Sequence, residues 1–352
     1  MCDWDEDSEG EDSSSDGYSY GPSHELSHSS QDDLRLFLDK IQTMGNFATC
    51  RYYRSFANPG LQIEEHAAAV SLPLMAHDAE AIKSACEQAP FGQGDQTLVD
   101  TSVRKTWQLD HTQYRLLNPG WNAFFEHVIA DVACDLGLTQ VVALPYKLLL
   151  YEEGSFFKPH RDSEKMVGMV GTLVICLPSE HEGGDVCLSF RNKKRVLATS
   201  PTSAFNMTAL AWFSDVTHEV EKLTSGHRLV LIYNLVQTGP ARQSALFFND
   251  QSLQLQQLVV NWQSKCPNDK LLIYPLEHEY TEASLSSWNM KGRDIAVSQS
   301  LLDISSISGL FLFFAHMTHS KQRPTSEGDD NLEKTTKLDV VYTSDGNPIV
   351  SN

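Results

Sequence analysis

The chain has 352 residues, of which 41% are hydrophobic, and a formal net charge of −19. This size and apolar content are sufficient for one large domain or two smaller ones, each with a buried core. The negative charge argues against direct binding to nucleic acid or to an anionic membrane, because both partners require a basic face.

The acidic charge is concentrated at the N-terminus. Eleven acidic residues and no Lys or Arg lie in residues 1–33, so the other 319 residues carry a net charge of −8. Residues 1–30 also have almost no aliphatic side chains with which to form a core. We therefore predict an acidic disordered tail over residues 1–33, which is either simply solvated or a docking segment for a partner.

Targeting signals and cysteine usage predict the compartment. The acidic N-terminus is unlike a signal or transit peptide, and no apolar run reaches the ~18 residues of a membrane span. The seven cysteines are scattered, odd in number and never arranged as CxxC, which is typical of reduced thiols rather than of disulfides or a zinc site. We expect a cytoplasmic or nuclear protein that has no membrane partner.

Residues 34–140 are predicted to form a helical or mixed support region. Residues 78–89 have a helical pattern, and a clearer helix follows Asn118, which can cap it, with Pro119 at the first helical position. Gly137 ends this second helix. Its apolar residues recur with helical spacing at positions 121, 124, 125, 128, 129, 132, 133 and 136.

From residue 141 the apolar pattern changes to that of strands. Strands are predicted at 141–151, 156–162, 169–177, 185–190, 194–199, 203–213 and 228–236. Turn sequences separate several of them, at 182–185, 200–201 and 224–226. Many short strands preceded by helices predict a mainly β fold with flanking helices, whose core is a double-stranded β-helix (jelly roll) over residues 141–238.

The composition changes again after residue 238. Residues 253–262 and 281–290 have helical patterns, whereas 321–337 are polar. We therefore predict that residues 239–352 form a C-terminal α-rich accessory region, which is partly disordered from about residue 321.

Residues 146–162, with the sequence YKLLLYEEGSFFKPHRD, contain the most informative pattern. An apolar strand is followed by an extended segment in which Pro159 disfavours helix. Because residues two apart in an extended chain point the same way, His160 and Asp162 present an imidazole and a carboxylate to one point. This pair supplies two of the three ligands of a metal site.

Three histidines downstream could provide the third ligand: His181, His218 and His227. His181 lies in an acidic turn, where we expect it to face solvent. His218 follows an apolar strand, and a return through a turn at Ser225-Gly226 would place Arg228 beside it on a neighbouring strand. Two imidazoles and a carboxylate leave open positions for a cosubstrate and O₂, as in non-haem Fe(II) oxygenases, and arginine is the natural partner of a carboxylate.

An ordered set of residues extends this pattern: Tyr151-x-x-Gly154-x-x-Phe157-x-x-His160-x-Asp162, then Glu182-Gly183-Gly184, then His218 and, ten residues later, Arg228. This set resembles the 2-oxoglutarate and Fe(II)-dependent dioxygenases of the prolyl 4-hydroxylase-like branch. The resemblance covers residues 145–236. Around 90–150 and 276–285 the chain also resembles a group of fungal and other eukaryotic proteins that carry this domain.

The resemblance implies a role for each of these side chains. His160, Asp162 and His218 would bind Fe(II), Arg228 would pair with the distal carboxylate of 2-oxoglutarate, and Tyr151 would line the cosubstrate pocket. With O₂, and with ascorbate as a supporting reductant, 2-oxoglutarate would yield succinate and CO₂ while a substrate C–H bond is hydroxylated.

The substrate and two other function classes remain open. By family likeness the leading substrate is a prolyl or other protein side chain, with a small molecule or a nucleobase as the alternative, although the acidic charge disfavours nucleic acid. The chain could instead be a non-catalytic jelly-roll interaction protein, or a cupin-like metalloenzyme that does not use 2-oxoglutarate. Arg104 and Trp107 are interpreted as structural. The triplet His160-Arg161-Asp162 also occurs in kinases, but Val167 stands where a kinase needs a metal-binding Asn.

Overall fold

The computed structural model describes residues 29–64, 68–93, 96–239, 242–268, 271–322 and 333–349. The predicted tail lies outside these residues except at its end, where residues 30–33 form the first turn of a helix capped by Ser29. No helix in these ranges is both long and apolar enough to cross a membrane. The helices are α1 (Ser30–Lys40), α2 (Ala76–Ala85), α3 (Pro119–Leu136), α4 (Ala245–Lys265) and α5 (Gly292–Ser308).

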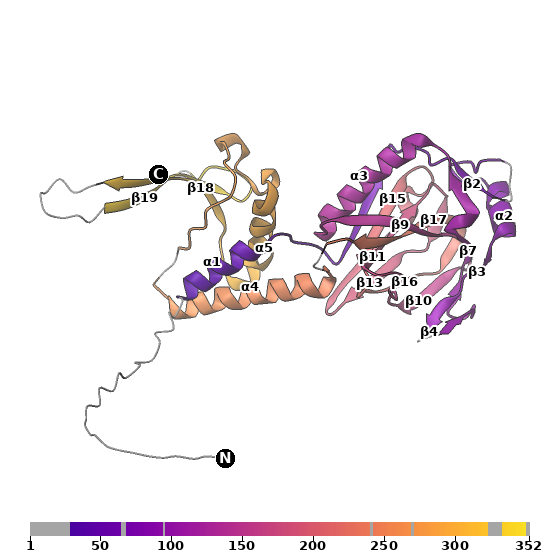
Figure 1. The fold of residues 1–352 in the computed structure, drawn as a ribbon, viewed down its shortest axis with the longest axis horizontal. Coiled ribbons are helices and arrows are strands. Elements are labelled where there is room, and N and C mark those ends of the chain that lie inside the picture. Colours follow the sequence, from indigo (N-terminus) through magenta and orange to yellow (C-terminus); the bar gives the residue numbers. More distant parts are fainter. Residues whose placement is uncertain are drawn as a thin grey trace, which may run out of the picture.

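Two antiparallel sheets face each other in the larger part of the molecule (Figure 1). The larger sheet runs β1-β15-β11-β17-β9-β7-β3, and β12 also pairs with β17. The smaller sheet runs β14-β13-β16-β10-β6. The prediction of a jelly-roll core flanked by helices is confirmed.

The strand bounds show which parts of the chain build each sheet. The larger sheet contains β1 (Ala48–Tyr53), β3 (Glu87–Gln88), β7 (Trp107–Asp110), β9 (Val141–Glu152), β11 (Met169–Cys176), β12 (His181–Gly183), β15 (Met207–Phe213) and β17 (Leu223–Gln237). The smaller sheet contains β6 (Arg104–Lys105), β10 (Phe156–His160), β13 (Val186–Phe190), β14 (Lys193–Leu197) and β16 (Thr217–Val220). Three separate two-stranded sheets pair β2 (Leu61–Ile63) with β8 (Tyr114–Leu116), β4 (Phe91–Gln93) with β5 (Gln96–Leu98), and β18 (Phe313–Gln322) with β19 (Glu333–Thr343).

Helix α3 covers the outer face of the larger sheet (Figure 1). Its predicted ends are confirmed: Asn118 accepts a hydrogen bond from the backbone of Gly120, and Gly137 closes the helix at φ 69°. The face that packs on the sheet includes Trp121 and Val132, and burial of each such side chain contributes on the order of 2 kcal/mol. The helix therefore gives the sheet a rigid outer layer.

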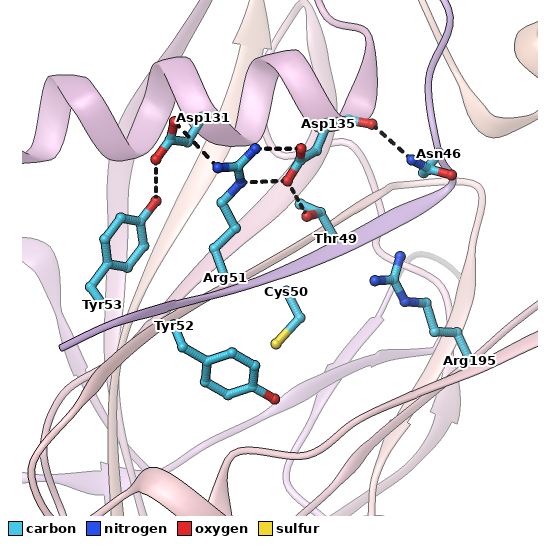
Figure 2. A pocket seen from close by; sticks show the side chains of 9 residues that line it. All are labelled: Asn46, Thr49, Cys50, Arg51, Tyr52, Tyr53, Asp131, Asp135 and Arg195. Carbon is cyan, nitrogen blue, oxygen red and sulfur yellow. Dashed lines mark hydrogen bonds and ion pairs between the residues drawn. The ribbon is translucent and has the colours of Figure 1, made fainter. Parts of the chain in front are cut away.

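A polar clamp fastens β1 to the same helix (Figure 2). Arg51 donates to both carboxylate oxygens of Asp135, at 2.6 and 2.7 Å, and the hydroxyl of Tyr53 donates to Asp131. The hydroxyl of Thr49 also donates to Asp135. These groups line a surface pocket, but they satisfy one another, so we interpret the pocket as a structural junction between strand and helix.

The course of the chain around β17 differs from the prediction. The expected turn at Ser225-Gly226 is wrong, because both residues lie inside β17 and pair with β12. Gly226 is needed there for close approach: its φ is +76°, and a Cβ would collide with the carbonyl oxygen of Glu180. The strand β16, which contains His218, was not predicted.

The C-terminal part contains α4, α5 and the β18–β19 hairpin, together with α1 from the other end of the chain (Figure 1). Leu34 and Leu38 of α1 share an apolar cluster with Leu255 and Val259 of α4. The predicted helix over 281–290 is wrong, because this segment forms only short 3-10 turns, at Glu282–Ser284 and Ser287–Asn289. The hairpin was not predicted, and residues 323–332 of the expected disordered stretch lie outside the described residues.

Candidate metal centre

Three of the predicted site residues converge where β10 pairs with β16 in the smaller sheet. His160 is the last residue of β10, and it is the direct antiparallel partner of His218 on β16. Asp162 follows two residues later along the extended chain. One ligand atom from each of the three side chains lies within 4.8 Å of the other two, and the two imidazole rings are 4.2 Å apart.

Hydrogen bonds orient each of the three side chains. Nδ1 of His160 lies 2.8 Å from the carbonyl oxygen of Lys158, and Nδ1 of His218 lies 3.4 Å from that of Val216. A carbonyl can only accept, so both Nδ1 atoms carry the proton and both Nε2 atoms keep a free lone pair. His218 Nε2 is 3.8 Å from Oδ1 of Asp162. This is the arrangement in which neighbouring groups fix the tautomer of a metal ligand.

The carboxylate of Asp162 is held by one of its oxygens. Oδ2 accepts hydrogen bonds from the hydroxyl of Thr172, at 2.7 Å, and from the indole of Trp212, at 3.2 Å. Oδ1 is therefore left to face the two histidines. The contact between Trp212 and Asp162 was not predicted. The sequence placed Trp212 only in an apolar strand, and no pattern links it to an aspartate 50 residues away.

The electrostatics of the three side chains suit a metal ion. Burial lowers the pKa of both His160 and His218, and for His160 the neighbouring His218 lowers it further. Burial alone would raise the pKa of Asp162, but His218 and the hydrogen bond from Thr172 outweigh this effect and lower it. Near neutral pH the group therefore offers two neutral imidazoles and one carboxylate, which is the protonation state that a metal requires.

A cleft of about 760 Å³ connects these ligands to a buried arginine between the two sheets. Arg228 is 1% exposed and pairs in register with Tyr151 of β9, whose ring centre lies 5.2 Å from the guanidinium. The guanidinium also donates to the thiol of Cys176, at 3.4 Å, whereas Nε has no hydrogen-bond partner among the described residues. Within the described ranges no carboxylate forms an ion pair with Arg228.

The placement of Arg228 corrects one detail of the prediction. His218 and Arg228 do not lie on neighbouring strands of one sheet, because β16 belongs to the smaller sheet and β17 to the larger. Both side chains nevertheless line the same cleft, as does Tyr151. An unpaired buried cation is costly, so this end of the cleft is suited to a ligand that carries a carboxylate.

The other candidates have different environments. His181 was expected to face solvent, but it is 4% exposed, and its two ring nitrogens contact Ser179 and Thr199. Trp107 donates to Glu152. Arg104 donates to the carbonyl oxygen of Pro90 and also lines the cleft.

A second group with metal-like composition lies in the C-terminal part: Glu277, His278 and Asp294. Its buried member, Asp294, already accepts hydrogen bonds from the backbone of residues 277 and 278, from the His278 ring and from the hydroxyl of Tyr280. These donors use its lone pairs, so we interpret the group as a structural tie between the chain at residues 277–280 and the first turn of α5.

The chain was compared with curated proteins, with solved structures and with family models. No curated protein matches the chain. Among solved structures it is similar to a prolyl-4-hydroxylase of Pseudomonas putida, with 16% identity, 57% of this chain and 98% of that chain covered, and a TM-score of 0.35. It is also similar to a prolyl hydroxylase of Trichoplax adhaerens, in complex with a hypoxia inducible factor peptide fragment, with 12% identity, 59% and 90% covered, and a TM-score of 0.38.

The family comparison is more specific. Residues 146–236 match the model described as the 2OG-Fe(II) oxygenase superfamily, and this segment contains the converging His160, Asp162 and His218 as well as Arg228. This segment of the chain is therefore similar to the 2OG-Fe(II) oxygenases, and its three converging side chains form a candidate iron site.

Proposed function

We propose that His160, Asp162 and His218 hold Fe(II) in this protein and that Arg228 binds the distal carboxylate of 2-oxoglutarate, against the ring of Tyr151. The observation that carries this proposal is the isolation of Arg228. A guanidinium that is 1% exposed, with an unpartnered Nε, faces the same cleft as three converging metal ligands. A dicarboxylate that also reaches the metal would satisfy both ends of the cleft.

The chain's own residues would hold the reactants and keep water out. Iron with bound 2-oxoglutarate supplies the oxidising chemistry, in which O₂ and 2-oxoglutarate yield succinate, CO₂ and a hydroxylated substrate. Thr172 and Trp212 keep one oxygen of Asp162 occupied, so that the other faces the metal position. Leu149, Val174 and Val230 line the cleft with apolar side chains, which lowers the local dielectric and strengthens the pairing at Arg228.

We further propose that the reaction is hydroxylation of a C–H bond in a protein side chain, with proline as the first candidate. The support for this is the sequence resemblance to the prolyl 4-hydroxylase-like branch, together with a cleft whose rim residues Lys158 and Arg161 are exposed and accessible to a polypeptide. A scaffold protein would have no need for an uncompensated buried Arg228.

The six described cysteines are free thiols, which supports the expected cytoplasmic or nuclear location.

The proposal is tested by turnover without substrate. The purified full chain with Fe(II) and ascorbate should slowly convert 2-oxoglutarate to succinate, and His160→Ala and Asp162→Ala should each abolish both iron binding and succinate formation. His127→Ala is the matched control, because His127 is an exposed residue of α3, which packs on the outer face of the larger sheet, and it does not line the cleft. Wild-type succinate no higher than that of metal-free protein would refute the oxygenase assignment of these residues.

A further inference from the structure

The charge of the cleft is opposite to that of the whole chain. Although the protein has a net charge of −19, six cationic side chains line the cleft. They are Arg104, Lys147, Lys158, Arg161, Lys165 and Arg228. The carboxylates that line it are Asp100 and Asp162, the second of which is a metal ligand in the proposed function. A concave surface with one sign of charge attracts ligands of the opposite sign.

The cations at the mouth of this cleft form no close ion pairs within the described residues, although Lys158 interacts at longer range with the carboxylate of Asp100. Lys147 donates to the amide of Gln108, Arg161 to a threonine hydroxyl and Lys165 to a serine hydroxyl. In the part of the chain that the structure describes, none of these side chains, nor Lys158, forms an ion pair with a carboxylate. Their charges are therefore available to a bound ligand.

Arg104 brings one of these charges close to the metal ligands. Its guanidinium lies 4.6 Å from the ring centre of Phe157. The ring of Phe157 also stacks on the imidazole of His160, with ring centroids 3.5 Å apart. Nη1 of Arg104 donates to the carbonyl oxygen of Pro90, but Nε is buried and has no partner. Since the proposed function uses Arg228 for the cosubstrate, Arg104 is the inner cation that remains for the substrate.

The aromatic side chains of the cleft argue for a peptide rather than a nucleic acid. Proteins bind unpaired bases by stacking them on free aromatic faces. Here Phe157 lies between Arg104 and His160, and Trp212 packs against His218, with ring centres 4.6 Å apart. Tyr146 has the ammonium of Lys147 over its ring, at 5.2 Å. These rings are already covered by neighbouring side chains, whereas Arg161 and Lys165 at the rim contact only neutral hydroxyl groups.

We propose that the substrate of this oxygenase is an acidic segment of a polypeptide, whose carboxylates are bound by Arg104 inside the cleft and by Lys158, Arg161 and Lys165 at its rim. This inference rests on the proposed function, because it takes the cleft beside the metal ligands as the place where the substrate binds. It adds a chemical class to the substrate: the residue to be hydroxylated lies next to Asp or Glu.

A binding experiment with defined probes tests this inference. Fluorescently labelled decaglutamate, decalysine and decathymidylate are titrated with the metal-free full chain, and the affinity is measured by fluorescence anisotropy at low and at moderate ionic strength. The test variant is Lys158→Glu with Lys165→Glu. The control is Lys194→Glu with Lys265→Glu, which makes the same change in net charge at two exposed positions, on β14 and at the end of α4.

We expect decaglutamate to bind better than the other two probes, and we expect the test variant to bind it at least about tenfold more weakly than wild type. The control should change the affinity by less than about twofold. Equal effects of the two variants, or tighter binding of decalysine or decathymidylate, would overturn the inference. Because the assay uses no iron and measures no succinate, a failure of the proposed oxygenase function would appear only in the turnover experiment.

Discussion

Replacement of Arg228 by methionine separates a ligand-binding arginine from a structural one. The thioether has a similar length and fills the same apolar space, but it removes the charge. In the structure the guanidinium has two weak contacts, with the thiol of Cys176 at 3.4 Å and with the ring of Tyr151, whose centre is 5.2 Å away. Replacing an uncompensated buried charge by an apolar side chain is neutral or stabilising, so we expect the ligand-free Arg228→Met protein to gain roughly 0 to 3 kcal/mol in its free energy of unfolding.

The same change should weaken the binding of 2-oxoglutarate. Each hydrogen bond to a charged group contributes about 1.5–3 kcal/mol, so the loss of a two-pronged pair, offset by the desolvation that binding no longer requires, costs about 3 kcal/mol. This corresponds to a dissociation constant raised about a hundredfold. At a 2-oxoglutarate concentration near 100 times the wild-type dissociation constant, wild type should be stabilised by about 2.7 kcal/mol and Arg228→Met by only about 0.4 kcal/mol.

The assay is chemical denaturation with and without 2-oxoglutarate, with Mn(II) in place of Fe(II) to prevent turnover. Arg51→Met is the control with the opposite signature. Its two hydrogen bonds to Asp135 are purely structural and half-exposed, so we expect a loss of about 1 kcal/mol in unfolding free energy and an unchanged response to 2-oxoglutarate. A ligand-free Arg228→Met protein that is destabilised by several kcal/mol, yet still responds fully to 2-oxoglutarate, would refute the ligand-binding role.

Two further predictions concern the metal ligands. Thr172→Val removes the hydrogen bond that holds Oδ2 of Asp162, so Fe(II) affinity measured by titration should fall about tenfold, while unchanged affinity would show that Trp212 alone suffices. Burial lowers the pKa of His160, His218 and His181 below the ordinary 6.5. The unfolded chain therefore takes up protons below pH 6.5 that the folded chain does not, and the unfolding free energy of metal-free protein should fall by roughly 1 kcal/mol per histidine per pH unit. Equal stability at pH 7 and pH 5.5 would contradict this pKa assignment.

The parts of the site that sequence could predict are those set by local geometry. His160 and Asp162 face one point because two residues of extended chain separate them, and that alternation needs no knowledge of the rest of the fold. The caps of α3 at Asn118 and Gly137 were predictable for the same reason, since each depends on the backbone conformation of a few consecutive residues.

The parts that could not be predicted depend on pairing between distant strands. A sequence pattern gave no way to tell that β16 and β17 separate into opposite sheets after only Glu221 and Lys222, so the relation of His218 to Arg228 was wrong in detail. The helix predicted for residues 281–290 was wrong for a related reason. Asp294, a residue outside the segment, accepts hydrogen bonds from backbone groups just before it and holds that chain against α5.

The cleft also limits what net charge can say about function. The net charge of −19 is a sum to which residues 1–33 contribute more than half. The repulsion between this charge and other anions is screened beyond about 8–10 Å at physiological salt. Inside the cleft, apolar walls and unpaired cations such as Arg104 keep the local field positive over the distances at which a substrate is held. The acidic surface therefore disfavours long polyanions, which must contact it, but not a short acidic peptide that enters the cleft. On this reasoning the same charge distribution that argues against nucleic acid makes the protein selective for a small stretch of carboxylates.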